Sequence, residues 1–286
     1  MPRPSALIVD SFAAVGLADV DALAAAPDRI DTKYVISVAE VVALAERLRS
    51  THAVLEIEGR REFAYRTTYF DTAELRMFRD HMQRRRRRYK CRSREYVDSG
   101  LCMFEVKLKA ARGRTVKHRM VYDRALRDEL STNALGFVRD CVAHAYAREP
   151  DGVLAPALVV EFTRITFAAA DLGERVTCDF GVVFSAPDGT SGRLVEDSVI
   201  VECKSSHGAT VADRALRALA ARPQSGCSKY CLGVAFTRPR VKSNDLRPLL
   251  TRYFRPAPIA AVALGLDAAV AAVTHDPTAT AELLGP

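Results

Sequence analysis

Polar and apolar residues alternate with a period of two along much of this chain, a pattern typical of β-strands. Turn signals such as DSG, DLG and PDG separate the alternating stretches. The stretches lie at residues 29–37, 61–71, 87–97, 101–111, 115–123, 157–168, 175–185 and 197–205. Together they predict a mostly antiparallel sheet of seven or eight strands.

A second pattern, with apolar residues three or four positions apart, predicts helices. It is clearest after residue 37, at Val38, Val41, Val42, Leu44 and Leu48. Ser37 followed by Glu40 is a capping-box signature, so we expect this helix to begin there. Further helices are expected at about 17–26, 72–82, 124–148 and 209–222. Several of these helices can cover one face of the sheet from outside.

The strands carry charge on one face and apolar side chains on the other, because residues i and i+2 share a face. The charged sets are Arg29, Asp31 and Lys33; Arg66 with Thr68; Glu105, Lys107 and Lys109; Lys117 and Arg119; Arg175, Thr177 and Asp179; and Glu202 with Lys204. For one strand alone, the simplest interpretation is a face exposed to water. Across all strands, however, Arg and Lys dominate and carboxylates are single, whereas a surface selected for solubility mixes the signs more freely. We therefore expect a barrel with a polar lumen.

Positive charge is concentrated in one region of the chain. The stretch RRRRRYKCRSREY at 84–96 holds seven arginines and one lysine, with one acid, Glu95. Between Arg79 and Arg119 there are 15 Arg and Lys against 4 Asp and Glu, although the net charge of the whole chain is only +7. On a strand, alternate positions from Arg84 to Arg94 would share one face. The basic stretch therefore predicts one wall of the lumen.

A basic lumen with a few acids fits phosphate chemistry. Guanidinium and ammonium groups match phosphate oxygens. The isolated carboxylates Asp31, Glu105, Asp179 and Glu202 are natural ligands for Mg²⁺ or Mn²⁺, which bridges phosphate oxygens. These features favour a di- or triphosphate substrate with a divalent metal ion, and duplex DNA would not fit inside such a lumen.

Composition adds bounds on size and compartment. With 286 residues, 49% of them hydrophobic, the chain can bury a substantial core. Its seven cysteines form no CxxC pair, which favours a reducing cytoplasm, and Cys227 with Cys231 lacks the partners of a zinc site. The apolar stretch 257–273 is too short and interrupted to span a membrane. We expect a soluble cytoplasmic protein.

Nine short motifs follow one another in a recognisable order. They are R-x-D-x-K-Y at 29–34, TTYFDT at 67–72, K-x-R-x-R-x-Y at 90–96, FEVK at 104–107, TVKHR at 115–119, FTR at 162–164, RVTCD at 175–179, VECK at 201–204 and SKY at 228–230. In this order they resemble the vacuolar transporter chaperone (VTC) domain, a polyphosphate polymerase domain of the CYTH-like triphosphate tunnel metalloenzyme superfamily. The resemblance covers residues 28–238.

The resemblance implies an α+β fold, namely an eight-stranded antiparallel β-barrel, or triphosphate tunnel, with helices packed outside. Residues 1–27 would form an N-terminal helical extension, and residues 239–286 an Ala- and Pro-rich C-terminal appendage. A segment of that appendage, AVALGLDAAVAAV at 261–273, suggests a plug or gate at the tunnel mouth.

The resemblance, with the strand phases, also implies site residues. Catalytic phosphate contacts are expected from Lys33, Arg92, Arg94, Lys107, Arg164, Arg175 and Lys204. Further phosphate-binding residues are Arg29, Arg66, Lys90, Lys109, Lys117, Arg119 and Lys229. Glu202 is the implied metal ligand, with Asp179 and Glu105 as additional metal candidates for Mn²⁺ or Mg²⁺.

The implied reaction is transfer of the γ-phosphate of ATP to a growing polyphosphate chain, with release of ADP. ATP and polyphosphate or triphosphate are the expected partners, and nucleic acid is not. The sequence leaves open whether a membrane protein at the inner face of a membrane receives the product. Hydrolases of the superfamily open with E-x-E-x-K, whereas this chain has Arg29 and Asp31 there, which favours the polymerase branch.

Several neighbouring residues have simpler interpretations. We expect His118 to be packed or hydrated, Asp71 to cap a helix, and Glu161 to point outward. Arg84, Arg85 and Arg87 are expected to be solvated at the end of the strand or in a loop, the alternative being that they attract polyphosphate.

Three alternative functions remain at this point. Attack by water in place of a phosphate chain would make the same site an inorganic or nucleoside triphosphatase. A polyphosphate or nucleotide sensor would keep the tunnel without turnover. A nucleic-acid-binding protein would use Tyr89 and Tyr96 to stack bases beside the arginines, although the lumen carboxylates would repel a phosphate backbone.

Overall fold

The computed structural model describes residues 6–25, 30–110, 114–205, 208–224 and 228–257. The helices are α1 (Ala6–Val9), α2 (Leu17–Ala25), α3 (Val38–Leu48), α4 (Arg76–Met82), α5 (Thr132–Tyr146), α6 (Val211–Ala218), α7 (Lys229–Thr237) and α8 (Arg247–Tyr253). The strands are β1 (Ala14–Val15), β2 (Ile30–Ser37), β3 (Ala53–Leu55), β4 (Phe63–Thr72), β5 (Tyr89–Tyr96), β6 (Leu101–Lys109), β7 (Thr115–Val121), β8 (Leu154–Ala169), β9 (Glu174–Ser185), β10 (Ser191–Leu194), β11 (Ser198–Ser205) and β12 (Phe254–Pro256).

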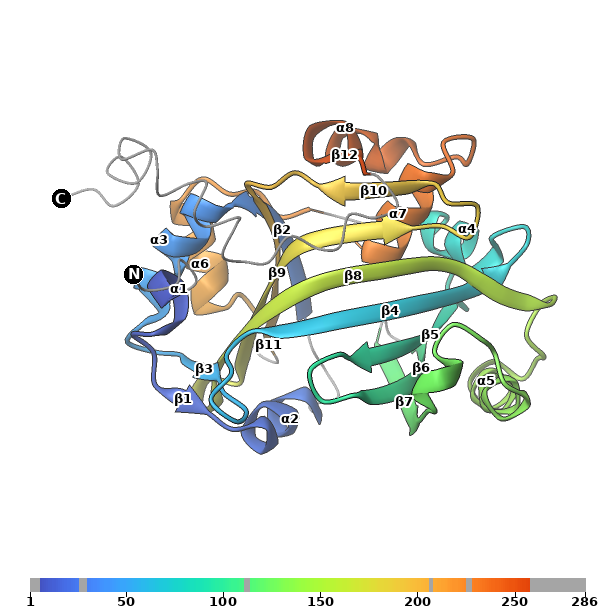
Figure 1. Ribbon diagram of the computed structural model, residues 1–286, viewed down its shortest axis with the longest axis horizontal. Helices are drawn as coiled ribbons and strands as arrows, with labels where there is room; N and C mark the ends of the chain where they lie inside the picture. Colours follow the sequence, from blue (N-terminus) through green and yellow to red (C-terminus); the bar gives the residue numbers. More distant parts are fainter. Residues whose placement is uncertain (1–5, 26–29, 111–113, 206–207, 225–227, 258–286) are drawn as a thin grey trace.

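Eight strands form one antiparallel path in the order β2-β11-β9-β8-β4-β5-β6-β7. They coincide with the eight stretches in which polar and apolar residues alternate, so the α+β class and the eight-stranded antiparallel architecture are confirmed (Figure 1). The short strands β10 and β12 extend the sheet beside β9, and β3 joins β8 and carries β1.

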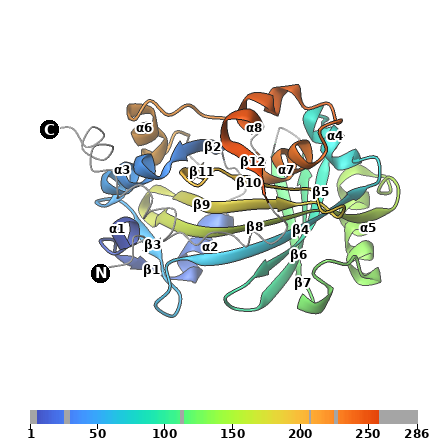
Figure 2. The ribbon, with the colours of Figure 1, turned by 45° about the horizontal axis from the view of Figure 1, so that its top comes forward.

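The path is not closed by hydrogen bonds into a complete barrel. Within the described residues β7 does not pair with β2. Instead, the outer edge of β2 is occupied by the chain that follows α6, where the Gln224 amide donates to the Lys33 carbonyl at 2.7 Å. The strong twist of the strands is visible where β5 to β7 run across the direction of β8 and β9 (Figure 2).

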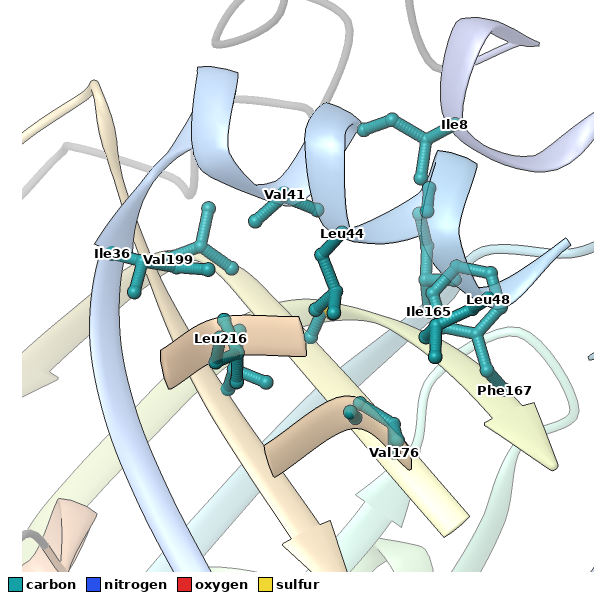
Figure 3. Packing of buried hydrophobic residues seen from close by; sticks show 14 of the residues in the cluster. Ile8, Ile36, Val41, Leu44, Leu48, Ile165, Phe167, Val176, Val199 and Leu216 are labelled. Atoms are coloured by element: carbon teal, nitrogen blue, oxygen red, sulfur yellow. The ribbon is translucent and has the colours of Figure 1, made fainter. Parts of the chain in front are cut away.

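The outer face of the sheet is apolar and covered by helices. Val41, Leu44 and Leu48 of α3 pack with Leu216 of α6 over the outward side chains of β2, β11, β9 and β8 (Figure 3). The predicted capping box starts α3, because Ser37 Oγ accepts the Glu40 amide at 3.2 Å and the Glu40 carboxylate accepts the Ser37 amide at 2.7 Å. Helix α5 covers β5 and β6 in the same way.

The opposite face, called the inner face below, contains the residues in phase with Lys33 and Glu202. At one end it is apolar and is covered by α7, whose Tyr230, Leu232 and Val234 pack with Val160 and Ile200. A Cβ at position 233 would collide with Leu158, so the close contact between α7 and β8 requires Gly233. The remainder of the inner face is charged.

Both flanking regions contribute to the folded body. Ile8, Val9 and Phe12 belong to the same core cluster as α3, and β1 pairs with β3. On the other side, Leu249 and Phe254 join the core around α7, and β12 pairs with β10. The domain limits at residues 27 and 238 stay predictions, and the segment 261–273 lies outside the described residues. No helix in the described ranges is long and apolar enough to cross a membrane.

Candidate phosphate-binding site

The first cluster of the inner face surrounds Glu202 on β11. The register places Glu202 beside Lys33 of β2 on one side and Thr177 of β9 on the other. Lys33 Nζ lies 2.7 Å from Glu202 Oε1, and Lys204 Nζ contacts Oε2. Burial alone would raise the pKa of Glu202, but Lys204 and Lys33 hold it well below 4.5. The carboxylate is therefore ionised and held between two ammonium groups.

Lys204 is the titratable member of this cluster. Burial lowers its pKa from 10.5 to about 8; Glu202 opposes the shift and Arg175 adds to it. Lys204 pairs in register with Asp31 of β2 and Arg175 of β9, both on the inner face. A further anion near Lys204 would raise this pKa and draw in a proton.

A second cluster joins β8, β9 and α7. Arg164 holds Asp179 at two points, with Nε to Oδ1 at 2.6 Å and Nη2 to Oδ2 at 2.9 Å. Lys229, the first residue of α7, contacts the same Oδ2. Burial would raise the pKa of Asp179, but Arg164 and Lys229 lower it to about 2. The start of α7 is thereby tied to the charged part of the inner face.

A third cluster joins β5, β6 and β7. Arg92 Nε lies 2.7 Å from Glu105 Oε2, and Lys117 Nζ lies 3.5 Å from Oε1. Arg92 also donates to the Tyr69 hydroxyl at 3.0 Å. Although burial opposes ionisation of Glu105, the surrounding cations keep its pKa well below 4.5. All three carboxylates are thus ionised and already neutralised by two cations each.

Arg94 and Lys107 differ from these cations because the described residues give neither of them a carboxylate partner. Arg94 Nε reaches only the Thr67 hydroxyl, at 3.3 Å. Burial and then Arg92 lower the pKa of the half-buried Arg94. Desolvation of the ammonium group and then Arg92 lower the pKa of Lys107 well below 10.5, although part of the Lys107 side chain is exposed to solvent. Each of these cations lies near Arg92 without a carboxylate partner of its own among the described residues, an arrangement that favours a nearby anion.

Charges on strands far apart in the sheet act on one another. Glu202 and Lys204 of β11 influence the pKa of Lys107 of β6, and Asp31 of β2 influences that of Lys109. Arg94 and Arg164 also share the ring of Tyr65, at 5.4 and 5.1 Å from its centroid. The sheet is therefore curled, and the three clusters face a common space.

Helix α7 is fixed to this space by buried polar contacts. Lys90 Nζ donates to Ser228 Oγ at 2.8 Å and lies 5.5 Å from the centre of the Tyr230 ring. The Tyr230 hydroxyl donates to Asp71. Asp71 also accepts the amides of Met77 at 2.9 Å and Phe78 at 3.0 Å. The expected helix begins at Arg76 and not near Thr72, and its N-cap residue is Leu75; Asp71 nevertheless accepts two amides of the first turn, as a capping side chain does. The same carboxylate connects α4 with α7.

Comparison with known proteins now identifies the family. The VTC domain matches residues 28–238, which is most of the chain and covers the whole eight-stranded path. The chain belongs to the VTC domain family. No curated protein gives a significant match.

Among solved structures, this VTC domain is similar to HpAC1 from Hippeastrum, an adenylyl cyclase candidate described as having a dominant triphosphatase activity. The two chains are 16% identical, the match covers 75% of this chain and 96% of that chain, and the TM-score is 0.44. Adenylate cyclase candidates from Bacillus halodurans and Vibrio parahaemolyticus share 16% and 14% identity over 68% of this chain and 90% and 87% of theirs, with TM-scores of 0.39 and 0.38.

The VTC domain places nearly all the sequence-predicted residues on the inner face. Those brought together there are Lys33, Lys90, Arg92, Arg94, Lys107, Lys109, Lys117, Arg119, Arg164, Arg175, Lys204, Lys229, Glu105, Asp179 and Glu202. Arg66 does not join them. It lies on the outer face of β4, where its Nη1 pairs with Asp128 at 2.6 Å. Arg29 and Cys227 lie outside the described residues.

The structure also places the neighbouring residues for which we expected no role in the site. Glu161 points outward as expected and lies 3.7 Å from Arg66. His118 is exposed, on the face of β7 opposite Lys117 and Arg119. The strand β5 begins at Tyr89, so Arg84, Arg86 and Arg88 precede the strand on which we had expected them, and Arg84, Arg85 and Arg87 are exposed in the preceding turn.

Sequence reasoning missed Tyr69, Thr177 and the helical nature of residues 229–237. Tyr69 lies on the face of β4 opposite Arg66, which is the inner face, and its hydroxyl accepts a hydrogen bond that orients Arg92. The alternation of residues along β4 could have indicated this position. Thr177 was recognised as in phase with Asp179 but received no role; it is 2% exposed and its hydroxyl has no hydrogen-bond partner in the described structure. Helix α7 has apolar residues on all sides, so no helical period marked it.

Of the three inner-face carboxylates discussed above, one is suited to hold a divalent cation. The described residues contain no group of three or more His, Cys, Asp or Glu side chains that could hold a metal. Asp179 and Glu105 are 0% and 1% exposed and fully engaged by cations, whereas Glu202 is 17% exposed. Mg²⁺ is commonly held by one or two carboxylates together with substrate phosphates and water. Glu202 is the side chain that fits this role.

Proposed function

We propose that this VTC domain is a polyphosphate polymerase that transfers the γ-phosphoryl group of ATP to the end of a growing polyphosphate chain. The observation that carries the proposal is the inner face itself. Cations from β2, β5, β6, β7, β8, β9, β11 and α7 face one space, and they outnumber the carboxylates there. Arg94 and Lys107 lack carboxylate partners among the described residues, which supports binding of a highly charged anion such as a triphosphate.

The chain's own residues would act mainly through position and charge. Phosphoryl transfer requires alignment of the attacking and leaving oxygens and stabilisation of charge on the phosphoryl oxygens. Arg94 and Lys107 would bind phosphate oxygens directly, while Arg92 and Arg164 are held in place by Glu105 and Asp179. The bond between the γ-phosphorus and the bridging oxygen breaks, ADP leaves with that electron pair, and a chain-end oxygen forms the new bond.

No general base is needed for this transfer, because the attacking chain-end oxygen is already anionic. Glu202 would hold the divalent cation, Mn²⁺ or Mg²⁺, which neutralises charge on the phosphate oxygens when bound. The two lysines that now neutralise Glu202 would then be available to the phosphates. Water as the attacking group would give free phosphate, so a triphosphatase is the alternative activity of the same site.

Other features of the proposal concern partners and location. Tyr89 is 4% exposed and packs in the core beneath α5, which removes one of the two aromatic residues that could stack bases. We therefore propose ATP and polyphosphate as partners, and not nucleic acid. The six described cysteines are free and buried, which is compatible with a reducing compartment such as the cytoplasm. Location and a membrane partner for the product stay predictions.

The test is to incubate the purified full chain with ATP and Mn²⁺ or Mg²⁺ while following ADP, free phosphate and polyphosphate together. ADP with polyphosphate, abolished in Glu202→Gln, is the expected result. ADP with free phosphate and no polymer would identify a triphosphatase instead. No turnover, despite tight binding of polyphosphate, would make the protein a sensor and overturn the enzymatic proposal.

A further inference from the structure

The turn before β5 is a concentrated patch of positive charge outside the inner face. It contains Arg84 to Arg88, named the arginine turn below; Arg84 to Arg87 are exposed. Its backbone is fixed, because the amides of Arg84 and Arg85 donate to the carbonyls of His81 at 3.1 Å and Asp80 at 2.9 Å. Arg84 adopts a left-handed conformation with φ of 53°. The arginines are therefore presented from a defined turn.

Most of this charge is not neutralised. Arg85 pairs with Asp80 at 3.2 Å, and Asp80 is also shared by Arg76. Arg87 and Arg88 donate only to backbone carbonyls, those of Tyr146 and Arg85. The side chains of Arg84 and Arg86 have no hydrogen bond or ion pair with any other residue that the structure describes. One carboxylate therefore serves the whole turn, and two guanidinium groups are available to a ligand.

The arginine turn continues the row of cations on β5. Arg94, Arg92 and Lys90 share the inner face, and Arg88 is in the same phase directly before the strand. Alternate residues of a strand are about 7 Å apart, so the row forms a regular track. The Arg88 carbonyl accepts the Lys109 amide at 2.9 Å and the Tyr146 hydroxyl at 2.6 Å, which fixes the end of the row beside β6.

The field at this junction is positive. After burial, the charges of Lys90, Arg88 and Lys109 contribute to lowering the pKa of His81 to about 2, so His81 is neutral and adds no charge. All three cations therefore lie near the half-buried His81 ring, at the point where the inner face meets the turn. A flexible anion leaving the inner face along β5 would pass from Lys90 to Arg88 and then to the exposed arginines.

We propose that the arginine turn is an exterior binding site for the part of a polyphosphate chain that extends beyond the inner face. This inference rests on the proposed function, because it assumes a phosphate chain bound by the inner-face cations. Guanidinium groups bind phosphate oxygens at two points, and a linear polyanion gains affinity from each contact by releasing counter-ions. A ligand of only three phosphates contacts the inner face and does not require the turn.

Two other polyanionic partners fit the turn less well. Nucleic acid bound in single-stranded form requires exposed aromatic rings for stacking, and Tyr89 beside the turn is buried in the core. An anionic membrane is commonly held by apolar side chains inserted next to the charges, and residues 84–88 contain none. The test includes both partners as separate arms.

The experiment compares the wild-type chain with the double variant Arg84→Gln/Arg86→Gln. Affinity for long-chain polyphosphate and for tripolyphosphate is measured over a range of KCl concentrations. A matched control, Arg240→Gln/Arg247→Gln, removes the same charge from two exposed arginines, one between α7 and α8 and one at the start of α8. Binding of single-stranded DNA and of anionic phospholipid vesicles is measured in parallel.

We expect the arginine-turn variant to bind long-chain polyphosphate about tenfold more weakly, with the slope of log affinity against log salt reduced by about two. Its affinity for tripolyphosphate and the affinities of the control variant should equal those of the wild type. Unchanged binding of the long chain, an equal loss for tripolyphosphate, or a loss confined to DNA or vesicles would overturn the inference. If the wild type binds neither phosphate ligand, the proposed function fails as well.

Discussion

Arg164 and Asp179 face each other across β8 and β9 and form a two-point ion pair, with Nε to Oδ1 at 2.6 Å and Nη2 to Oδ2 at 2.9 Å. Lys229 of α7 adds a second cation to the same carboxylate. Asp179 is completely buried, so its charge has no solvent to stabilise it and depends on these partners. The pair thus joins two strands and a helix around the inner face.

Replacing Asp179 with Asn should destabilise the protein strongly. The substitution leaves Arg164 and Lys229 without their counter-ion, and removal of one partner from a buried ion pair costs about 3–5 kcal/mol. Asp188→Asn is the control, because Asp188 pairs with Arg238 at 2.8 Å but is 54% exposed. Urea denaturation should show a much lower midpoint for the Asp179 variant and a near-normal midpoint for the control. Equal midpoints would contradict the structural role of Asp179.

Binding of tripolyphosphate should weaken as the pH rises through about 8. The pKa of free Lys204 is about 8, and only its protonated form attracts phosphate. Because a bound anion raises this pKa, binding near pH 8 should be accompanied by proton uptake. Calorimetry in buffers of different ionisation enthalpy measures that uptake. In Lys204→Arg the side chain stays charged, so both the proton uptake and the loss of affinity above pH 8 should diminish.

A wild type that binds tripolyphosphate equally at pH 7 and pH 9, without proton uptake, would show that Lys204 does not contact the phosphates. The Arg variant is the necessary reference, since tripolyphosphate itself gains negative charge over the same range and this acts in the opposite direction. The comparison between the two proteins therefore isolates the contribution of Lys204.

The Thr177 hydroxyl offers a test of local packing. Because it is buried without a hydrogen-bond partner among the described residues, replacing it by the methyl group of Val removes an unsatisfied polar atom. Thr177→Val should raise the free energy of unfolding by about 1 kcal/mol. Thr68→Val should lower it by a similar amount, since Thr68 donates to Asp128 at 2.5 Å on the outer face. A lower stability of the Thr177 variant would mean that the hydroxyl has a partner.

Much of this architecture follows from the period-two pattern alone. Eight alternating stretches became the eight strands, and phase placed residues as distant as Lys33 and Lys107 on the same face. The capping residues of α3 were equally readable, because Ser37 and Glu40 act within one turn of chain. Arg66 shows the limit of phase reasoning: without the register of β4, its charge could not be assigned to a face, and it lies outside.

The pairing of charges could not be predicted, because it depends on how far the sheet curls and on α7. Glu202 was the implied metal ligand, and Glu105 and Asp179 were additional candidates; Glu105 and Asp179 are buried among cations, and only Glu202 keeps some exposure. The contact between Lys229 and Asp179 joins residues that are far apart in the sequence, and no local signal indicates it. Likewise, the fact that Arg94 has no carboxylate partner among the described residues becomes visible only in three dimensions.

The central claim is that the inner face binds a triphosphate through Arg94 and Lys107. Titration calorimetry with tripolyphosphate on the wild type, Arg94→Gln, Lys107→Gln and Arg66→Gln tests it directly, with thermal unfolding of each protein as the control for folding.

Losing one charged contact to phosphate should weaken binding about 10- to 100-fold in the two inner-face variants. Their stability should be unchanged or higher, since a like-charge repulsion is relieved. Arg66→Gln should bind normally and be less stable. Normal affinity in both inner-face variants, or loss of affinity only in Arg66→Gln, would contradict the account.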